Sequence, residues 1–138
     1  MKLIILFSLF FVLFSCASKP LAPICPNATE SVIIPKVEAL KIQGNVSQFL
    51  TDAQITQEHG KEGESSVWRF TNMPRDSVYY FIGLRDGDAI YQTNLGPQTS
   101  SINLISDLSG ISSGTTNCLY VRSKENLDRV IKVVVDKK

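Results

Sequence analysis

The fold is decided by the stretch Ile82-Gly83-Leu84-Arg85-Asp86-Gly87-Asp88-Ala89-Ile90, which places a charged turn between apolar residues. Gly87 suits the positive backbone angle of a tight turn, and Asp88 can accept hydrogen bonds from the amides of that turn. Leu84 is expected to fill the core before the turn, and Ile90 to begin a buried strand after it. The stretch therefore predicts residues that build the fold and do not contact a ligand.

Short elements are predicted on both sides of this turn. They are strands over 46–50, 53–57 and 66–70, a helix over 76–82, a strand over 89–93, a helix over 100–109, and a hairpin of strands over 117–122 and 127–136. The helix over 100–109 carries Ile102, Ile105 and Leu108 at helical spacing, and Gly110 ends it. Together these elements predict one small α+β domain over residues 46–138.

The segment before this domain reads differently. Residues 17–44 hold four of the six prolines, which predicts an extended tether, and the lipidated N-terminus and tether are assigned to 16–45. Residues 32–34 and 37–42 are apolar and predict either a strand or a short helix that docks on the domain.

The N-terminal residues resemble a bacterial export signal. An apolar run over 3–14 is too short to cross a bilayer as a helix and is typical of a signal peptide, here assigned to 1–15. The run ends in Leu13-Phe14-Ser15-Cys16, which resembles the lipobox of bacterial lipoproteins. The resemblance implies cleavage before Cys16, lipid on its sulfur and, from Ala17, an outer-membrane location facing the periplasm. Ordinary cleavage after Ala17, which gives a soluble product, is the alternative.

The charge of the chain bears on its partners. The formal net charge is +1, and Lys2 is the only charge before residue 19. Cleavage before Cys16 would leave a formally neutral protein. This balance argues against a nucleic-acid binder, which would carry a basic face, and favours protein partners.

The turn stretch, followed by Asn94, is similar to the G-L-x-x-G-D-x-I-x-x-x-N run of bacterial PDZ domains. Phe49-Leu50-Thr51-Asp52-Ala53 and Val67-Trp68-Arg69-Phe70 look like strands of the PDZ domain in the type II secretion system C component. The resemblance covers roughly residues 46–136. It implies a PDZ-like fold, a small antiparallel β-sandwich or partly open barrel with two helices. The expected lipid anchor departs from that family, which uses an inner-membrane helix.

PDZ domains bind an extended peptide as an added strand. The resemblance implies a groove between the strand over 66–70 and the helix over 100–109, with the loop over 60–65 offering amides to a peptide carboxylate. Glu62 and Glu64 disfavour an anion in that loop. The expected ligand is therefore an internal strand or a folded partner in preference to a free C-terminus. The expected groove residues are Ser66, Val67, Trp68, Arg69, Phe70, Ser101, Leu104, Ile105 and Leu108.

Two readings of the aromatic residues remain open. Trp68 and Phe70 share one face of their strand by alternation, and they either belong to the core or include one residue that lines the groove. A groove closed by these rings would favour a rival function, a stand-alone structural lipoprotein of the envelope.

Once Cys16 carries lipid, Cys25 and Cys118 remain as an even pair in an oxidising compartment. Leu119 and Val121 claim one face of their strand, so Cys118 is expected on the other, less apolar face. The pair predicts a disulfide that pins the tether to the last hairpin, and two free thiols are the alternative.

Catalytic motifs are not evident. His59 is the single histidine, it lies in a polar loop, and it lacks the ligand spacing of a zinc site. We therefore expect no enzyme activity, no cofactor, no metal and no small-molecule substrate; a protease or enzyme subunit would need catalytic residues from a partner. The expected function is a membrane-anchored periplasmic interaction module whose partner belongs to the envelope or to a secretion machinery.

Overall fold

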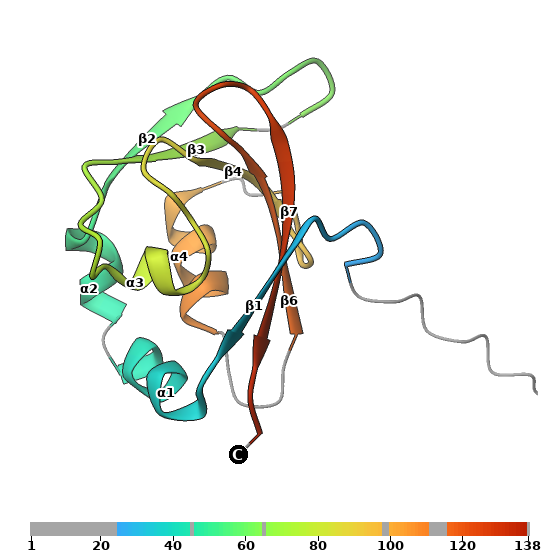
Figure 1. Cartoon of the computed structure of the whole chain (residues 1–138). Coiled ribbons are helices and arrows are strands. Elements are labelled where there is room, and N and C mark those ends of the chain that lie inside the picture. Colours follow the sequence, from blue (N-terminus) through green and yellow to red (C-terminus); the bar gives the residue numbers. More distant parts are fainter. Residues whose placement is uncertain (1–24, 45, 65, 98–99, 111–115, 138) are drawn as a thin grey trace, which may run out of the picture.

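The computed structural model describes residues 25–44, 46–64, 66–97, 100–110 and 116–137 (Figure 1). The elements in chain order are β1 (Glu30–Ile34), α1 (Lys36–Gly44), α2 (Val46–Thr51), β2 (Gln54–Glu58), β3 (Val67–Thr71), α3 (Val78–Phe81), β4 (Ala89–Thr93), β5 (Gly96–Pro97), α4 (Ser101–Ser109), β6 (Thr116–Arg122) and β7 (Asp128–Val135).

The strands form one sheet in the spatial order β1-β7-β6-β4-β3-β2, with the two-residue β5 beside β4. Neighbouring strands pair antiparallel except β1 and β7, which are parallel. The sheet curves around the helices, and α4 lies on its concave side (Figure 1). Its path ends at β1 and at β2. This arrangement confirms the predicted α+β class with a partly open barrel.

The core lies between the sheet and the helices. The rings of Phe70 in β3 and Tyr79 in α3 are fully buried, with centroids 4.8 Å apart. Leu84 and Ile90 are also fully buried, one on each side of the turn, as the sequence predicts. The apolar residues of the turn stretch therefore hold the middle of the chain against the sheet.

The turn itself is held by one buried carboxylate. Asp88 accepts a hydrogen bond from the main-chain N–H of Arg85 at 2.8 Å, as predicted, and Gly87 has the left-handed φ of +86°. Asp88 also forms an ion pair with Arg129 of β7, whose guanidinium reaches Glu30 of β1 at 2.7 Å. One arginine of β7 therefore links the turn to the start of β1.

Two predicted helices are confirmed and one predicted strand is wrong. The helix expected over 76–82 is α3, where the side chain of Ser77 accepts a hydrogen bond from the N–H of Tyr80, and the helix over 100–109 is α4. Residues 46–50 form the helix α2 in place of a strand. This helix packs beside α4 and α3, and the Asp52 side chain that follows it accepts a hydrogen bond from the N–H of Val78. Tertiary packing overrides the weak strand preference of this segment.

The folded unit begins well before residue 46, which corrects the predicted boundary. Residues 32–34 belong to the strand β1 and residues 37–42 to the helix α1, so both of the open alternatives occur. Ile34, Ala39 and Ile42 are buried in the core. These contacts make residues 30–44 part of the domain, because the sheet would otherwise lose β1 and expose its apolar partners.

The export signal predicted over 1–15, the predicted lipidation residue Cys16 and Ala17 lie outside the described residues. None of the helices within the described ranges is long and apolar enough to cross a membrane.

Candidate functional site

The strand predicted to line the groove is not at an edge of the sheet. β3 pairs with β2 on one side, where Arg69 lies opposite Thr56, and with β4 on the other, where Arg69 lies opposite Ala89. A peptide strand adds only to a side that has no strand beside it. The structure therefore corrects the predicted location and leaves β2 as the edge strand next to β3.

Most of the predicted groove side chains fill the core. The six apolar members of the set are buried, and Trp68 and Phe70 both belong to the core cluster. Ser66, Arg69 and Ser101 are partly exposed. Arg69 is held by the Glu58 carboxylate at 2.7 Å and by the carbonyl oxygen of Gly87 at 2.6 Å. The predicted residues therefore do not line an open groove. The apolar ones pack in the core, and Arg69 forms an ion pair with Glu58.

The helix α4 buries two of the three apolar positions that the spacing suggests, Ile105 and Leu108, and leaves the third exposed. Ser100 caps the helix by accepting a hydrogen bond from the N–H of Asn103 at 3.2 Å. Leu104, Ile105 and Leu108 are buried, whereas Ile102 is 77% exposed. The buried stripe therefore runs through Leu104, Ile105 and Leu108, and Ile102 faces away from the core.

The loop predicted to bind a peptide carboxylate already holds a carboxylate of its own. Glu64 accepts hydrogen bonds from both terminal nitrogens of Arg122, at 3.0 and 2.7 Å. The N–H of Lys61 donates to the same carboxylate at 2.8 Å. Because Glu64 occupies the donors that an incoming anion would need, this loop is a closed element that fastens β6 to the segment between β2 and β3.

Glu64 makes the stability of the fold depend on pH. The hydrogen bonds from Arg122 lower the pKa of Glu64 from its usual range to about 2. A carboxyl group with a lower pKa in the folded state stabilises the fold when ionised, and this contribution is lost on acidification. After allowance for solvent screening, we expect the free energy of unfolding to fall by about 1–2 kcal/mol between about pH 5 and pH 2.

Urea denaturation at several pH values measures this effect, with Glu64→Gln as the control. The variant should be less stable at neutral pH and should approach the wild type as the pH falls. An equal acid loss in both proteins would contradict the assignment to Glu64.

Two residues of β2, Ile55 and Gln57, direct their main-chain N–H and C=O groups to the free edge of the sheet. Phe70 bonds toward the start of β4, because its N–H donates to Asp88 and its carbonyl oxygen accepts from Gly87, each at 2.8 Å. Main-chain groups alternate in direction along an antiparallel strand, so Arg69 bonds toward β2, where it lies opposite Thr56. By the same alternation, the main-chain groups of Ile55 and Gln57 point away from β3.

The surroundings of this edge combine an apolar and a polar part. Ile55 is half-buried and packs against the core, whereas Gln57 is exposed. A hollow of about 270 Å³ lies at the end of the strand, lined by Gln57, Glu58, His59 and Ser66. A sequence pattern does not distinguish an edge strand from an inner one, so this edge was identified only from the pairing of β3 with both β2 and β4.

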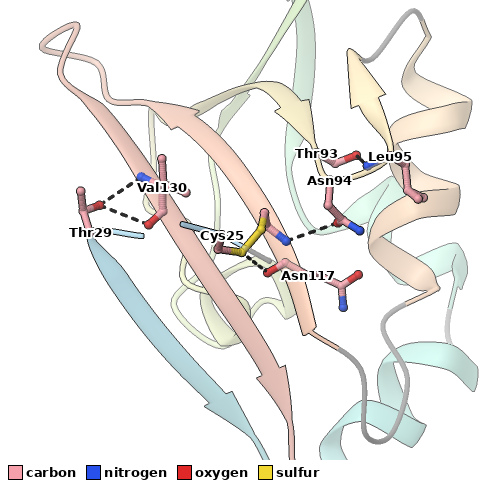
Figure 2. Close-up of a disulfide and its surroundings, with 8 residues drawn as sticks. Cys25, Thr29, Thr93, Asn94, Leu95, Asn117 and Val130 are labelled. Carbon is pink, nitrogen blue, oxygen red and sulfur yellow. Dashed lines mark hydrogen bonds between the residues drawn. A yellow bond between two sulfur atoms is a disulfide. The ribbon is translucent and has the colours of Figure 1, made fainter. Parts of the chain in front are cut away.

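The disulfide expected between Cys25 and Cys118 is present, with the two Cα atoms 5.5 Å apart (Figure 2). The Asn94 side chain accepts a hydrogen bond from the N–H of Cys118 at 3.3 Å. Four residues after Cys25, the Thr29 hydroxyl bonds to the main chain of Val130 on the neighbouring strand. The disulfide and this contact fasten the start of the described chain to β6 and β7.

Metal ligands do not gather in the described part of the chain. No group of three or more His, Cys, Asp and Glu side chains there is close enough to hold a metal ion, and His59 is exposed. No family model matches the chain, and no curated protein matches it either.

Proposed function

We propose that this protein is a lipid-anchored module of the periplasm that binds an extended segment of a partner protein as an added strand along β2. The partner would belong to the envelope or to a secretion machinery, with type II secretion as the first candidate. The observation that carries the proposal is the free edge of β2, where the main-chain groups of Ile55 and Gln57 point away from β3. The side chain of Ile55 is half-buried and adds an apolar contact beside this edge. Main-chain bonds along an edge supply affinity, and neighbouring side-chain pockets supply specificity.

The PDZ-like assignment is supported by the order of elements around the turn stretch. A hairpin of β2 and β3, the short helix α3, the turn at Gly87, the strand β4, the longer helix α4 and the final strands follow one another as the resemblance implies. The lipid anchor is supported by the residues around Cys16 and by the even pair of cysteines that remains without it.

Capture of partners from envelope membranes tests the proposed edge. We expect a cross-linked partner to be recovered with the wild type and with Gln57→Ala, and at least tenfold less with Gln57→Pro. Proline removes the N–H that points to the free edge and is tolerated there, because that group makes no bond to β3. Circular dichroism of both variants verifies that the fold is retained.

The anchor is tested in the same cells by feeding labelled palmitate. Label should attach to the wild type and not to Cys16→Ala, which should move from the membrane to the soluble fraction. Recovery of no partner by the lipidated wild type would reject the binding function and leave the anchor intact.

The second candidate is a stand-alone structural lipoprotein of the envelope. One observation favours it: Trp68, Phe70 and the buried side of α4 fill the space where the sequence analysis places a groove. This candidate predicts equal behaviour of Gln57→Ala and Gln57→Pro in every assay.

A further inference from the structure

The opposite edge of the sheet has an unusual apolar character. Seven large apolar side chains are exposed among the described residues, and three of them lie within eight positions of one another. Ile33 of β1 is 70% exposed, and Val37 and Leu40 of the adjoining α1 are 59% and 55% exposed. These three residues are close in sequence, and Ile33 belongs to the edge strand itself.

Among the described strands, β1 has a neighbour on one side only. It pairs with β7 in register from Glu30 opposite Ile131 to Ile34 opposite Val135, and it ends the described sheet. The carbonyl oxygen of Ile34 accepts a hydrogen bond from the N–H of Asp136 at 2.9 Å, so Ile34 bonds toward β7. Alternation along the strand then directs the main-chain groups of Ser31 and Ile33 to the free edge.

Ser31 and Ile33 of one copy can pair with Ile33 and Ser31 of a second copy about a two-fold axis. If two copies of β1 run antiparallel with Val32 at the axis, Ser31 lies opposite Ile33 of the second copy. Both residues direct their main-chain groups across the interface, so the pair can exchange both hydrogen bonds, and the axis repeats the exchange. Both side chains are exposed on the same face of the sheet, where a small Ser31 leaves room for a large Ile33.

The edge also lacks the features that usually prevent such pairing. Natural edge strands carry lysine, proline or inward charges that block addition of another strand. Residues 31–34 are uncharged, Pro35 lies just after the strand, and the charge of Glu30 is paired with Arg129 at 2.7 Å. A formal net charge of +1 leaves little repulsion between two copies.

We propose that two copies of this chain pair through antiparallel β1 strands and so form one continuous sheet across a two-fold axis. The pairing uses the β1 edge and leaves the β2 edge of each copy free. It does not depend on the proposed lipid anchor or on binding at β2, so it stands or falls separately from them.

Pairwise cysteine cross-linking tests the register in cells that make two versions of the full chain. A chain with Ser31→Cys and a chain with Ile33→Cys should form a disulfide-linked dimer on mild oxidation. The Cα atoms of a hydrogen-bonded antiparallel pair lie about 5.5 Å apart, within the range of a disulfide. The matched control combines a chain with Ser31→Cys and a chain with Ile102→Cys, since Ile102 is also highly exposed but lies on α4. This combination should give at least tenfold less dimer.

Sedimentation of the full chain in detergent tests the affinity. The wild type should sediment as a dimer, Ile33→Lys should weaken the dimer at least tenfold, and Ile102→Lys should leave it unchanged. A wild type that is monomeric at every concentration would overturn the proposal, and so would equal cross-linking of the two cysteine pairs. Recovery of Ile33 in contact with a different protein, with no self-pairing, would also overturn it.

Discussion

Replacement of Asp88 by alanine is expected to lower the free energy of unfolding by about 3–5 kcal/mol. Asp88 is almost fully buried, and burial raises the pKa of its carboxyl group, which shows that desolvation opposes the charge. The net value of the intact pair is therefore modest. Removing only the carboxylate is costly because it deprives the half-buried Arg129 of one partner and leaves the N–H of Arg85 without its acceptor.

Glu30→Gln is the matched control for this prediction, since Glu30 binds the same guanidinium of Arg129 from a more exposed position. We expect it to cost less than about 1 kcal/mol. Urea denaturation at neutral pH measures both variants. Equal losses for Asp88→Ala and Glu30→Gln would mean that the buried carboxylate stabilises the fold no more than the exposed one does.

Asp88 also illustrates what the sequence alone could predict. The bond from the N–H of Arg85 to Asp88 is local, because the two residues are only three positions apart. The positive φ of Gly87 is likewise a local property of the turn. The ion pair with Arg129 joins residues 41 positions apart and has no local signal. Turn chemistry was therefore predictable, and the partner across the sheet was not.

The predicted position of the candidate site was wrong for a similar reason. The residue pattern over 66–70 identifies a strand correctly, but a pattern does not show how many neighbours a strand has. β3 is an inner strand because residues beyond the turn return as β4 and occupy its second side. Edge and inner strands differ by tertiary pairing, so the free groups of Ile55 and Gln57 emerged only from the structure.

The N-terminal segment shows how composition misleads. Prolines at 20, 23, 26 and 35 indicate an extended tether, yet Pro35 lies between β1 and α1 and simply separates two ordered elements. The Val32 side chain packs near Gly83, where an added Cβ would approach it to 3.0 Å. Such contacts bring residues 30–44 into the domain, and they depend on residues that are far away in the chain.

Loss of the disulfide is expected to lower the free energy of unfolding by about 2–5 kcal/mol in the double variant Cys25→Ala, Cys118→Ala. The bridge joins residues 93 positions apart, so it restricts almost the whole described chain in the unfolded state. Both cysteines are buried in the folded state, and the bridge lies beside the contact of Thr29 with Val130. Loss of the bridge should therefore lower the local stability of β1 more than that of the inner strands.

Hydrogen exchange distinguishes this local effect from general weakening, because amides of β1 should lose more protection than those of β3 when the bridge is absent. Reduction of the wild type with dithiothreitol should reproduce the double variant, since both remove the same covalent link. Cys16→Ala is the matched control, because it removes a cysteine that takes no part in the bridge and should leave the urea midpoint unchanged. If the double variant kept its midpoint, the bridge would restrict a chain that is already compact when unfolded. The non-covalent contacts of β1 with β7 and with the core would then suffice to hold it in place.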